Sequence, residues 1–419
     1  MSMKILKRFA LASFFIIIPL ISFCDNKKKD NKKTNEYKID SVRCKLYINE
    51  GDSLAALKLY GEASSRYEQA IYFNPKNPDA YLKYAKLYSV INPKSSIETL
   101  QKLLIADSTV TIAKKEIAEL YYNIGDIPNA TKYYADYVES SNPSSDDIAR
   151  YSTILFSNKN YEKSLQYIKK FLEKDSNHFV LRRLRMYNEF ELKDTNIYTS
   201  AEKFMNESDT SIYIYYDYLY YSKILKDKKE YAKANISLEK ALTLDSTSVD
   251  LYKTIASNYE SLNNYEKAIE NYLMFFERGK VQLADYLILG QEYYFAGNNI
   301  PLQQDSIKRI SNLQKADSMF AIIVEKIPTN AIGNFWRARA NSSIDAETTL
   351  GLAKPYYEAA LVILEQENKD KKKIIECYSY LGYYYFVKNE MTTSKEYWNK
   401  ILVIDPTNDT ALKALKGIK

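Results

Sequence analysis

Residues that commonly carry enzyme chemistry are scarce in this chain of 419 residues. It contains one histidine, His178, and three cysteines. A zinc site of the HExxH type needs two histidines, and a Ser-His-Asp relay would depend on this single imidazole. The chain also lacks a CxxC pair for zinc and the GxxxxGKS/T and GxGxxG runs that cradle phosphate groups. We therefore predict a protein that is not an enzyme, with no catalytic residue, no metal site and no cofactor.

Side chains favoured at protein interfaces form two clusters. Arginine and tryptophan are common at the centre of such interfaces, and the 40 tyrosines of the chain add an unusual supply of aromatic rings. The clusters are Arg182, Arg183 and Arg185, and Trp336, Arg337 and Arg339. Both are candidates for binding a partner. The alternatives are a solvated helix face for the first cluster and packing between helices for the second, and the codon bias of an AT-rich genome is the alternative source of the tyrosines.

The net charge argues against nucleic acid as a partner. The whole chain carries +6. Lys4, Lys7 and Arg8 belong to a segment that we expect to be removed, and without their three charges the balance is +3. A charge this small, spread evenly along the chain, does not form the basic patch that nucleic-acid binding requires.

The N-terminal segment has the organisation of a secretory signal. An apolar run from Phe9 to Phe23 follows the three positive residues. As a helix it would reach about 23 Å, which is shorter than the hydrocarbon core of about 30 Å. Residues 1–23 are therefore predicted to be a signal peptide and not a spanning helix.

The end of this apolar run resembles the lipobox of bacterial lipoproteins. The residues are Leu20-Ile21-Ser22-Phe23-Cys24, and a polar segment rich in lysine and asparagine begins directly after them. In that family the cysteine becomes the lipidated first residue of the mature chain, which implies a lipid on Cys24. Phe23 departs from the family pattern, because the position before the cysteine is normally small. The alternative is an uncleaved N-terminal anchor with an incidental cysteine.

A lipid at Cys24 would give the protein a location. Residues 24–40 read as a polar linker, and the 13 residues from Asp25 to Tyr37 would span roughly 20 Å as a coil. The resemblance thus implies a protein anchored in the bacterial cell envelope through its N-terminal lipid. The outer membrane is the expected location, with its periplasmic and surface faces both open.

The rest of the chain must supply the elements that position the candidate binding residues. Only 10 glycines and 10 prolines occur, too few for the many turns of a β-rich or α/β protein of this length. From Cys44 onward a pattern recurs about every 34 residues, with small residues at positions 8 and 20 and aromatic residues at 11 and 24. Two clear examples are Ala118, Tyr121, Gly125, Ala130 and Tyr134, and Gly382, Tyr385, Ser394, Trp398 and Pro406.

This spacing resembles the tetratricopeptide repeat, a pair of antiparallel helices. The resemblance implies an all-α fold, a right-handed α-solenoid of about ten helical hairpins over residues 41–408 with a capping helix over 409–419. The expected units are 44–77, 78–110, 111–144, 145–178, 179–214, 215–248, 249–282, 283–330 with an insertion, 331–366 and 375–408. The fifth unit is the most degenerate. In this frame His178 falls in a loop between units, where we expect an exposed residue without a role, and Cys44 and Cys377 are expected to be buried packing residues.

Repeats of this kind bind proteins or extended peptides on the face formed by the first helix of each pair. Positions 2, 5, 9 and 12 line that face, and they include three candidate aromatic residues, Tyr122, Tyr216 and Tyr294. The lysine and asparagine set that forms the family's carboxylate clamp is not found. We therefore predict a binding scaffold with an adaptor or assembly role, similar to tetratricopeptide lipoproteins of Bacteroidota-type envelopes. The alternative is a surface glycan-capture lipoprotein resembling the SusD family, which is disfavoured because the repeats fill the chain.

Overall fold

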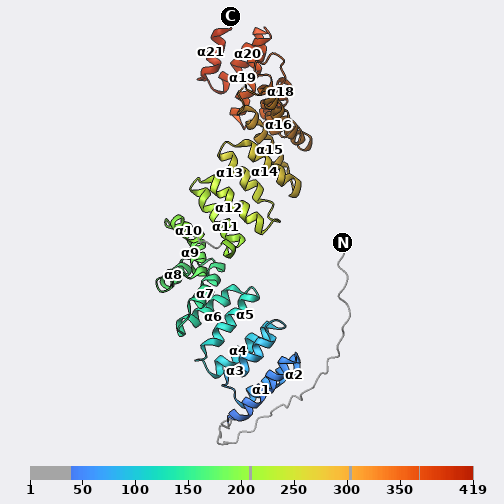
Figure 1. Ribbon diagram of the computed structural model, residues 1–419. Helices are drawn as coiled ribbons and strands as arrows, with labels where there is room; N and C mark the ends of the chain where they lie inside the picture. Colours follow the sequence, from blue (N-terminus) through green and yellow to red (C-terminus); the bar gives the residue numbers. More distant parts are fainter. Residues whose placement is uncertain (1–38, 207–209, 302–303, 368, 419) are drawn as a thin grey trace, which may run out of the picture. The chain divides into compact units, whose positions relative to one another are not determined.

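The computed structural model describes residues 39–206, 210–301, 304–367 and 369–418. Within these ranges it contains twenty-one α-helices, one short 3-10 helix and no strand, which confirms the predicted all-α class (Figure 1). The signal peptide, Cys24 and most of the linker lie outside the described residues. No helix in the described part of the chain is both long and apolar enough to cross a membrane.

The chain divides after Ala113 into two compact units. The first contains two helical hairpins, and α5 begins shortly before its end. The helices of these hairpins are α1 (Ser41–Ala56) with α2 (Tyr60–Phe73), and α3 (Pro78–Tyr88) with α4 (Pro93–Ala106).

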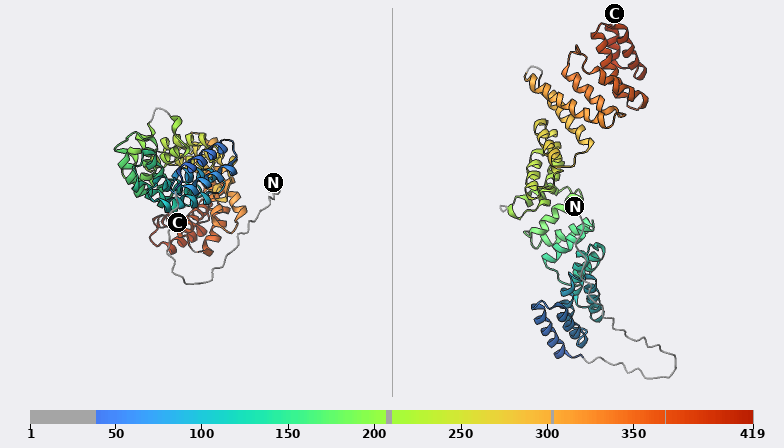
Figure 2. Two further views of the ribbon diagram at one scale, coloured as in Figure 1. Left: turned by 90° about the horizontal axis from the view of Figure 1, so that it is seen from below. Right: turned by 90° about the vertical axis from the view of Figure 1, so that its right-hand side faces the viewer.

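The second unit continues the same arrangement, with consecutive helices lying side by side as hairpins (Figure 1, Figure 2). Its first helices are α5 (Thr111–Asn123), α6 (Ile127–Ser140), α7 (Ser145–Ser157), α8 (Tyr161–Leu172), α9 (Phe179–Glu191), α10 (Ile197–Met205), α11 (Tyr215–Asp227) and α12 (Tyr231–Leu244). They are followed by α13 (Leu251–Ser261), α14 (Tyr265–Arg278), α15 (Leu283–Asn298), α16 (Ser306–Lys326), α17 (Ala331–Ile344), α18 (Lys354–Glu367), α19 (Lys371–Val387), α20 (Met391–Ile404) and the terminal α21 (Asp409–Gly417).

Small residues let the two helices of a hairpin approach closely. In the last hairpin the hydroxyl of Ser394 on α20 donates a hydrogen bond of 2.7 Å to the carbonyl of Gly382 on α19. Ser164 on α8 makes the same kind of bond, 3.1 Å long, to the carbonyl of Ser152 on α7. Each hydroxyl is thus satisfied by the facing backbone, and the large ring of Trp398 is 5% exposed beside Gly382.

The turns inside many of the hairpins share one backbone conformation, a residue with positive φ, although the turn between α3 and α4 has none. Gly125 has a φ of 81°, which suits a residue without a Cβ atom. Lys159, Lys229 and Asn389 occupy the equivalent place with φ values of 57°, 61° and 63°. In each of these turns only one residue separates the positive-φ residue from the second helix, so the connection between the two helices is short. In the α7–α8 hairpin the Asn160 side chain then caps α8 by accepting from the backbone N–H of Lys163.

The expectation for His178 was wrong. Its Nδ1 accepts a hydrogen bond of 3.3 Å from the backbone N–H of Leu181, so this imidazole caps the start of α9. Nδ1 as acceptor leaves the proton of the neutral ring on Nε2, which lies 3.1 Å from Asp146 Oδ1. The side chain is only 13% exposed. An imidazole nitrogen can thus replace the Asn or Asp that caps other helices, which a frame based on apolar spacing does not reveal.

The predicted packing role of the two later cysteines is confirmed. Cys44 and Cys377 are free thiols with no exposed surface. Burial, together with the nearby charge of Glu376, raises the pKa of the Cys377 thiol to about 12. Neither cysteine therefore has the lowered pKa of a reactive thiol.

The packing of α15 against α16 generates the first prediction. A Cβ atom added at Gly290 would lie 2.5 Å from the ring of Phe320, which is fully buried. We expect Gly290→Ala to lower the free energy of unfolding by about 1–3 kcal/mol through overpacking. Gly61→Ala is the matched control, because nothing lies within 4 Å of the added atom. Urea denaturation of both variants checks this, and equal stabilities would contradict the close contact.

Candidate binding surface

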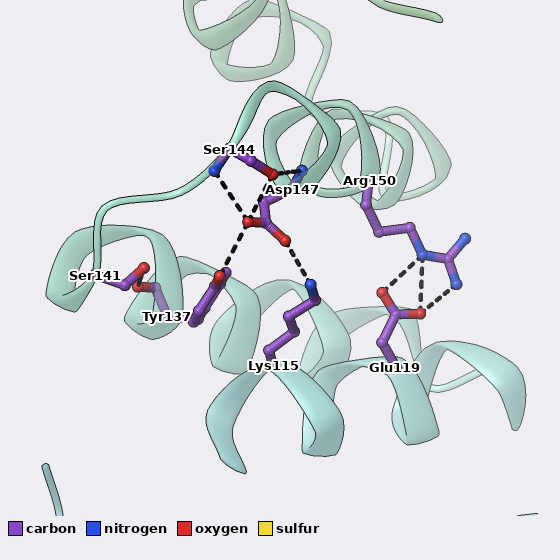
Figure 3. A network of polar contacts seen from close by, with 7 residues as sticks. All are labelled: Lys115, Glu119, Tyr137, Ser141, Ser144, Asp147 and Arg150. Carbon is purple, nitrogen blue, oxygen red and sulfur yellow. Dashed lines mark hydrogen bonds and ion pairs between the residues drawn. The ribbon is translucent and has the colours of Figure 1, made fainter. Parts of the chain in front are cut away.

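Polar side chains join successive hairpins at the starts of their first helices, as Figure 3 shows for Asp147 on α7. One oxygen of Asp147 accepts a bond of 2.5 Å from Lys115 Nζ on α5. The other accepts from the Tyr137 hydroxyl at 3.0 Å and from the backbone N–H of Ser144 at 3.0 Å. Ser144 in turn caps α7 by accepting from the N–H of Asp147. Three helices are therefore tied together at one carboxylate.

Electrostatics hold this carboxylate in its charged form. Burial raises the pKa of Asp147, but hydrogen bonds from Lys115, Ser144 and Tyr137 outweigh it and leave the pKa below its usual value. The pKa of Lys115 is raised, because its contact with Asp147 outweighs its own partial burial. An ion pair of this type positions hairpins and leaves neither group free to act as a general acid or base near neutral pH.

The same contact recurs every second hairpin. Asp217 on α11 is fully buried and accepts three bonds from Arg183 on α9, at 2.9, 3.1 and 2.8 Å, as well as one of 2.6 Å from the Tyr187 hydroxyl. Asp285 on α15 accepts from Lys253 Nζ on α13 at 3.2 Å. Each aspartate is the third residue of its helix and also accepts from the backbone N–H three residues before it.

These three sites were missed in the sequence, although a signal for them exists. Asp147, Asp217 and Asp285 are 70 and 68 residues apart, and their cations have a matching spacing. The aspartates recur once in two hairpins. A comparison of units 34 residues apart therefore places each aspartate beside a residue of another type in the unit between. A search at the doubled period would find an acid and a base in alternate units.

The three arginines of the cluster on α9 each contact a different partner. Arg183 contacts Asp217 as described and lies over the ring of Phe179 at 4.8 Å. Arg185 pairs at 2.7 Å with Glu189, which has no exposed surface. Arg182 donates to the carbonyl of Lys203 on α10 at 2.8 Å. The structure therefore places these arginines in contacts between and within helices, and a role for them in partner binding stays a prediction.

In the second cluster Trp336 lies in the core where α15, α16 and α17 meet, while Arg337 and Arg339 are partly exposed. Trp336 is 8% exposed, with its ring stacked on Phe320 at 5.6 Å and edge-on to Tyr294 at 5.4 Å. Arg339 lies 4.9 Å from the Trp336 ring and forms a two-bond pair with Glu376 on α19, at 2.7 and 2.6 Å. This arrangement favours the packing alternative for Trp336, because little of its ring is open to a partner.

The remaining candidates differ in how much surface they expose. Arg337 pairs with Asp317 on α16 at 2.9 and 3.0 Å and lies over the ring of Tyr356. Tyr122 is half-buried beneath the guanidinium of Arg150, 4.3 Å from its ring. Tyr216, in contrast, is 57% exposed on α11. Of the three aromatic candidates, Tyr216 has the surface that a binding role would need, and that role stays a prediction.

A cleft that the sequence did not single out lies within the first unit. Its volume is about 610 Å³. Its apolar wall consists of Ala55, Tyr60, Leu87, Val90 and Ile91, from the ends of α1 and α3, the start of α2 and the turn after α3. Its polar side carries Asp52, Tyr67, Lys83 and Lys86. Val90 and Ile91 are adjacent and 91% and 71% exposed, so together with Tyr60 and Leu87 they add apolar surface to a concave site.

One carboxyl has an unusual environment without forming a reactive centre. Glu292 on α15 is 1% exposed, and its Oε2 has no hydrogen-bond partner among the described residues. Burial, with a smaller effect from Glu260, raises its pKa to about 8. In the part of the chain that the structure describes, no group of three or more His, Cys, Asp or Glu side chains could hold a metal ion.

Comparison with known proteins identifies the repeat. The C-terminal part of a TPR repeat-containing protein from Cytophaga hutchinsonii is 29% identical, with a TM-score of 0.50, and the match covers 64% of this chain and 99% of that one. This match relates the chain, with its 34-residue sequence pattern, to a solved structure that is described as a TPR repeat-containing protein. This chain is a tetratricopeptide repeat protein.

Other solved TPR structures are more distant. A tetratricopeptide repeat protein from Parabacteroides merdae is 13% identical with a TM-score of 0.34, over 66% of this chain and 93% of that one. Yeast Tom70 is 13% identical with a TM-score of 0.31, over 90% and 88% of the two chains. No family model and no curated protein sequence matches this TPR protein.

The recurring aspartates give a prediction for the TPR array. Asp217→Asn leaves the guanidinium of Arg183 without its counter-charge at a site where the Arg183 side chain is 15% exposed. We expect the free energy of unfolding to fall by about 3 kcal/mol. Asp250→Asn is the control, because that carboxylate is 83% exposed and its loss should cost less than about 0.5 kcal/mol. Urea midpoints measure both, and a similar small loss in each would contradict a positioning role for Asp217.

The raised pKa of Glu292 leads to a prediction for how the stability of the TPR protein changes with pH. Its pKa is higher in the folded chain than in the unfolded chain, so its contribution to stability is full below about pH 4.5 and falls as pH rises toward 8. The slope is at most about 1.4 kcal/mol per pH unit. Glu292→Gln should therefore raise the urea midpoint at pH 8 and flatten its change between pH 5 and 8. Glu325→Gln, at a 72% exposed position, should leave the profile of the wild type, and an unchanged profile in Glu292→Gln would refute the account.

Proposed function

We propose that this TPR protein is a non-enzymatic scaffold that binds another protein or an extended peptide at the bacterial cell envelope, in an adaptor or assembly role. The observation that carries the proposal is the apolar cleft of the first two hairpins, where Val90 and Ile91 are 91% and 71% exposed. An exposed apolar surface of this kind marks an interaction site more often than it marks a structural one. The TPR fold supports the same conclusion, because stacked hairpins offer a long surface for a partner.

The charges of the array support a binding role over a catalytic one. Asp147, Asp217 and Asp285 are each engaged by a cation from the preceding hairpin and by a backbone N–H. Such groups are fixed for packing and do not converge on a substrate. Glu292 has the shifted pKa of a catalytic acid, but it is 1% exposed and thus closed to a substrate.

Glycan capture of the SusD kind is the less favoured candidate. Hairpins and the terminal α21 occupy the described part of the chain, and its longer connections lie between α10 and α11, between α15 and α16 and between α17 and α18. The sequences of these three segments contain a single aromatic residue, Tyr213, which is 4% exposed, so they do not supply the row of exposed rings that a sugar platform would need. Protein or peptide binding needs only the helix faces that are present.

The membrane anchor in this proposal is a lipid on Cys24. Its support is the sequence, in which an apolar run ends at Cys24 and a polar linker follows. Each buried CH₂ of an acyl chain contributes about 0.8 kcal/mol, so two or three chains hold a protein firmly at a membrane. The linker would keep the first unit within a few tens of ångströms of the lipid surface.

Crosslinking in the native cell envelope tests the scaffold role. A lysine-reactive crosslinker of defined length is applied to cells, the TPR protein is purified under denaturing conditions, and attached proteins are identified by mass spectrometry. The proposal expects one partner at a fixed ratio that is recovered repeatedly. Recovery of only abundant envelope proteins in varying amounts, or turnover of a substrate by the purified chain, would refute it.

The anchor predicts the behaviour of a single substitution. Cys24→Ala removes the sulfur that would carry the lipid, so we expect the protein to leave the membrane fraction or to keep its signal peptide. Membrane fractionation and intact mass measure these outcomes. Cys44→Ala is the control, since this buried thiol lies inside the first hairpin and its loss should change neither. An unchanged mass and fractionation in Cys24→Ala would exclude lipidation at this residue.

A further inference from the structure

The turns inside the first two hairpins each expose two large aliphatic side chains, whereas the turns between α5 and α6 and between α13 and α14 expose one each, Ile124 by 42% and Leu262 by 43%. The first turn exposes Leu57 and Leu59, by 69% and 43%, and the second exposes Val90 and Ile91. The corresponding turn between α11 and α12 is Lys228-Lys229-Glu230, and that between α19 and α20 is Lys388-Asn389-Glu390. A turn needs no exposed apolar side chain, because the turns after α11 and α19 consist of polar residues alone. The exposed aliphatic residues of the first unit therefore call for a separate explanation.

These aliphatic residues continue into a concave site. Val90 and Ile91 form one wall of the cleft and Tyr60, which is 47% exposed, lies on another element that lines it. The volume of about 610 Å³ is within the range of sites that hold small molecules or several side chains of a bound segment. A concave site of this kind can take up side chains that protrude from a bound peptide. A partner with a flat surface would contact only the edge of the cleft.

The charges around the cleft define what it would accept. Asp52 is neutralised by Lys83, whose Nζ lies 2.6 Å from Oδ2, and it accepts a further bond of 2.9 Å from the Tyr67 hydroxyl. Lys86 lies about one turn further along α3 and is exposed, and it forms no ion pair with any other described residue. The cleft thus offers one free positive charge beside an apolar surface, and a carboxylate is its complement.

We propose that this cleft binds a short amphipathic segment of a partner protein, with aliphatic side chains against Tyr60, Val90 and Ile91 and an aspartate or glutamate paired with Lys86. The inference rests on the proposed scaffold function and names the chemistry of its partner. The concave form of the site favours a peptide over a lipid surface, because a flat bilayer surface would not enter the cleft.

A random dodecapeptide library displayed on phage tests the assignment with the full chain, its lipid position changed to Cys24→Ala and the protein immobilised. We expect the selected peptides to be enriched in Leu, Ile and Val together with Asp or Glu. A labelled peptide of the selected sequence should bind at least tenfold more weakly to Ile91→Asp, as measured by fluorescence anisotropy. Ile105→Asp is the matched control, because Ile105 is an 86% exposed aliphatic residue of α4 outside the cleft, and it should bind as the parent does.

Charge reversal gives an independent readout. Lys86→Glu should favour a peptide in which lysine replaces the acidic residue, and circular dichroism should show that the variants remain folded. Failure to enrich any peptide, enrichment of basic peptides, or equal binding by Ile91→Asp would overturn the assignment. So would binding to phosphatidylglycerol vesicles that depends on Ile91 in the absence of peptide binding. A partner found by crosslinking in the envelope alongside a failed selection would leave the scaffold function in place and exclude only this cleft.

Discussion

The second unit depends on one recurring contact, in which an aspartate at the start of a hairpin is bonded both to its own helix and to a cation of the preceding hairpin. A single helical hairpin cannot bury its apolar face, so the next hairpin must meet it in one orientation. Apolar contacts are tolerant of small rotations, whereas the carboxylates of Asp147, Asp217 and Asp285 accept directed bonds. The aspartates therefore fix how alternate hairpins meet, and the small residues at Gly290 and Gly382 let the helices within a hairpin close together.

This use of charge shapes the rest of the surface. The arginines at positions 183, 185, 337 and 339 are held by acidic residues, and several also lie over aromatic rings. Many of the tyrosines serve the same packing, as in the stack of Tyr187 on Tyr220 at 4.3 Å. Affinity for a partner must then come from side chains that packing leaves free. Val90, Ile91, Lys86 and Tyr216 have that property, and three of them lie in the first unit.

The fold was more predictable from the sequence than the candidate site. Small and aromatic residues at fixed spacing report local packing, so Ala118, Ala130 and Tyr134 led to helical hairpins and Cys377 to the core. The partners of Arg183 and Arg339 lie 34 and 37 residues away, and composition alone does not say whether an arginine meets an acid or solvent. The role of His178 was missed because this cap is a single hydrogen bond, from the Leu181 N–H to the imidazole Nδ1, and the spacing of apolar residues gives no sign of it. The cleft was missed because Val90 and Ile91 resemble core residues until their exposure is known.

The central claim is that this TPR protein works by holding a partner. The most direct test is the mass and composition of the particle that it forms, extracted from its native envelope in a mild detergent. Mass photometry gives the particle mass, and denaturing mass spectrometry of the same fraction gives its subunits. The account predicts a particle heavier than the chain alone that contains a second protein at a fixed ratio. A particle that contains only this chain, under conditions that preserve other envelope complexes, would contradict it.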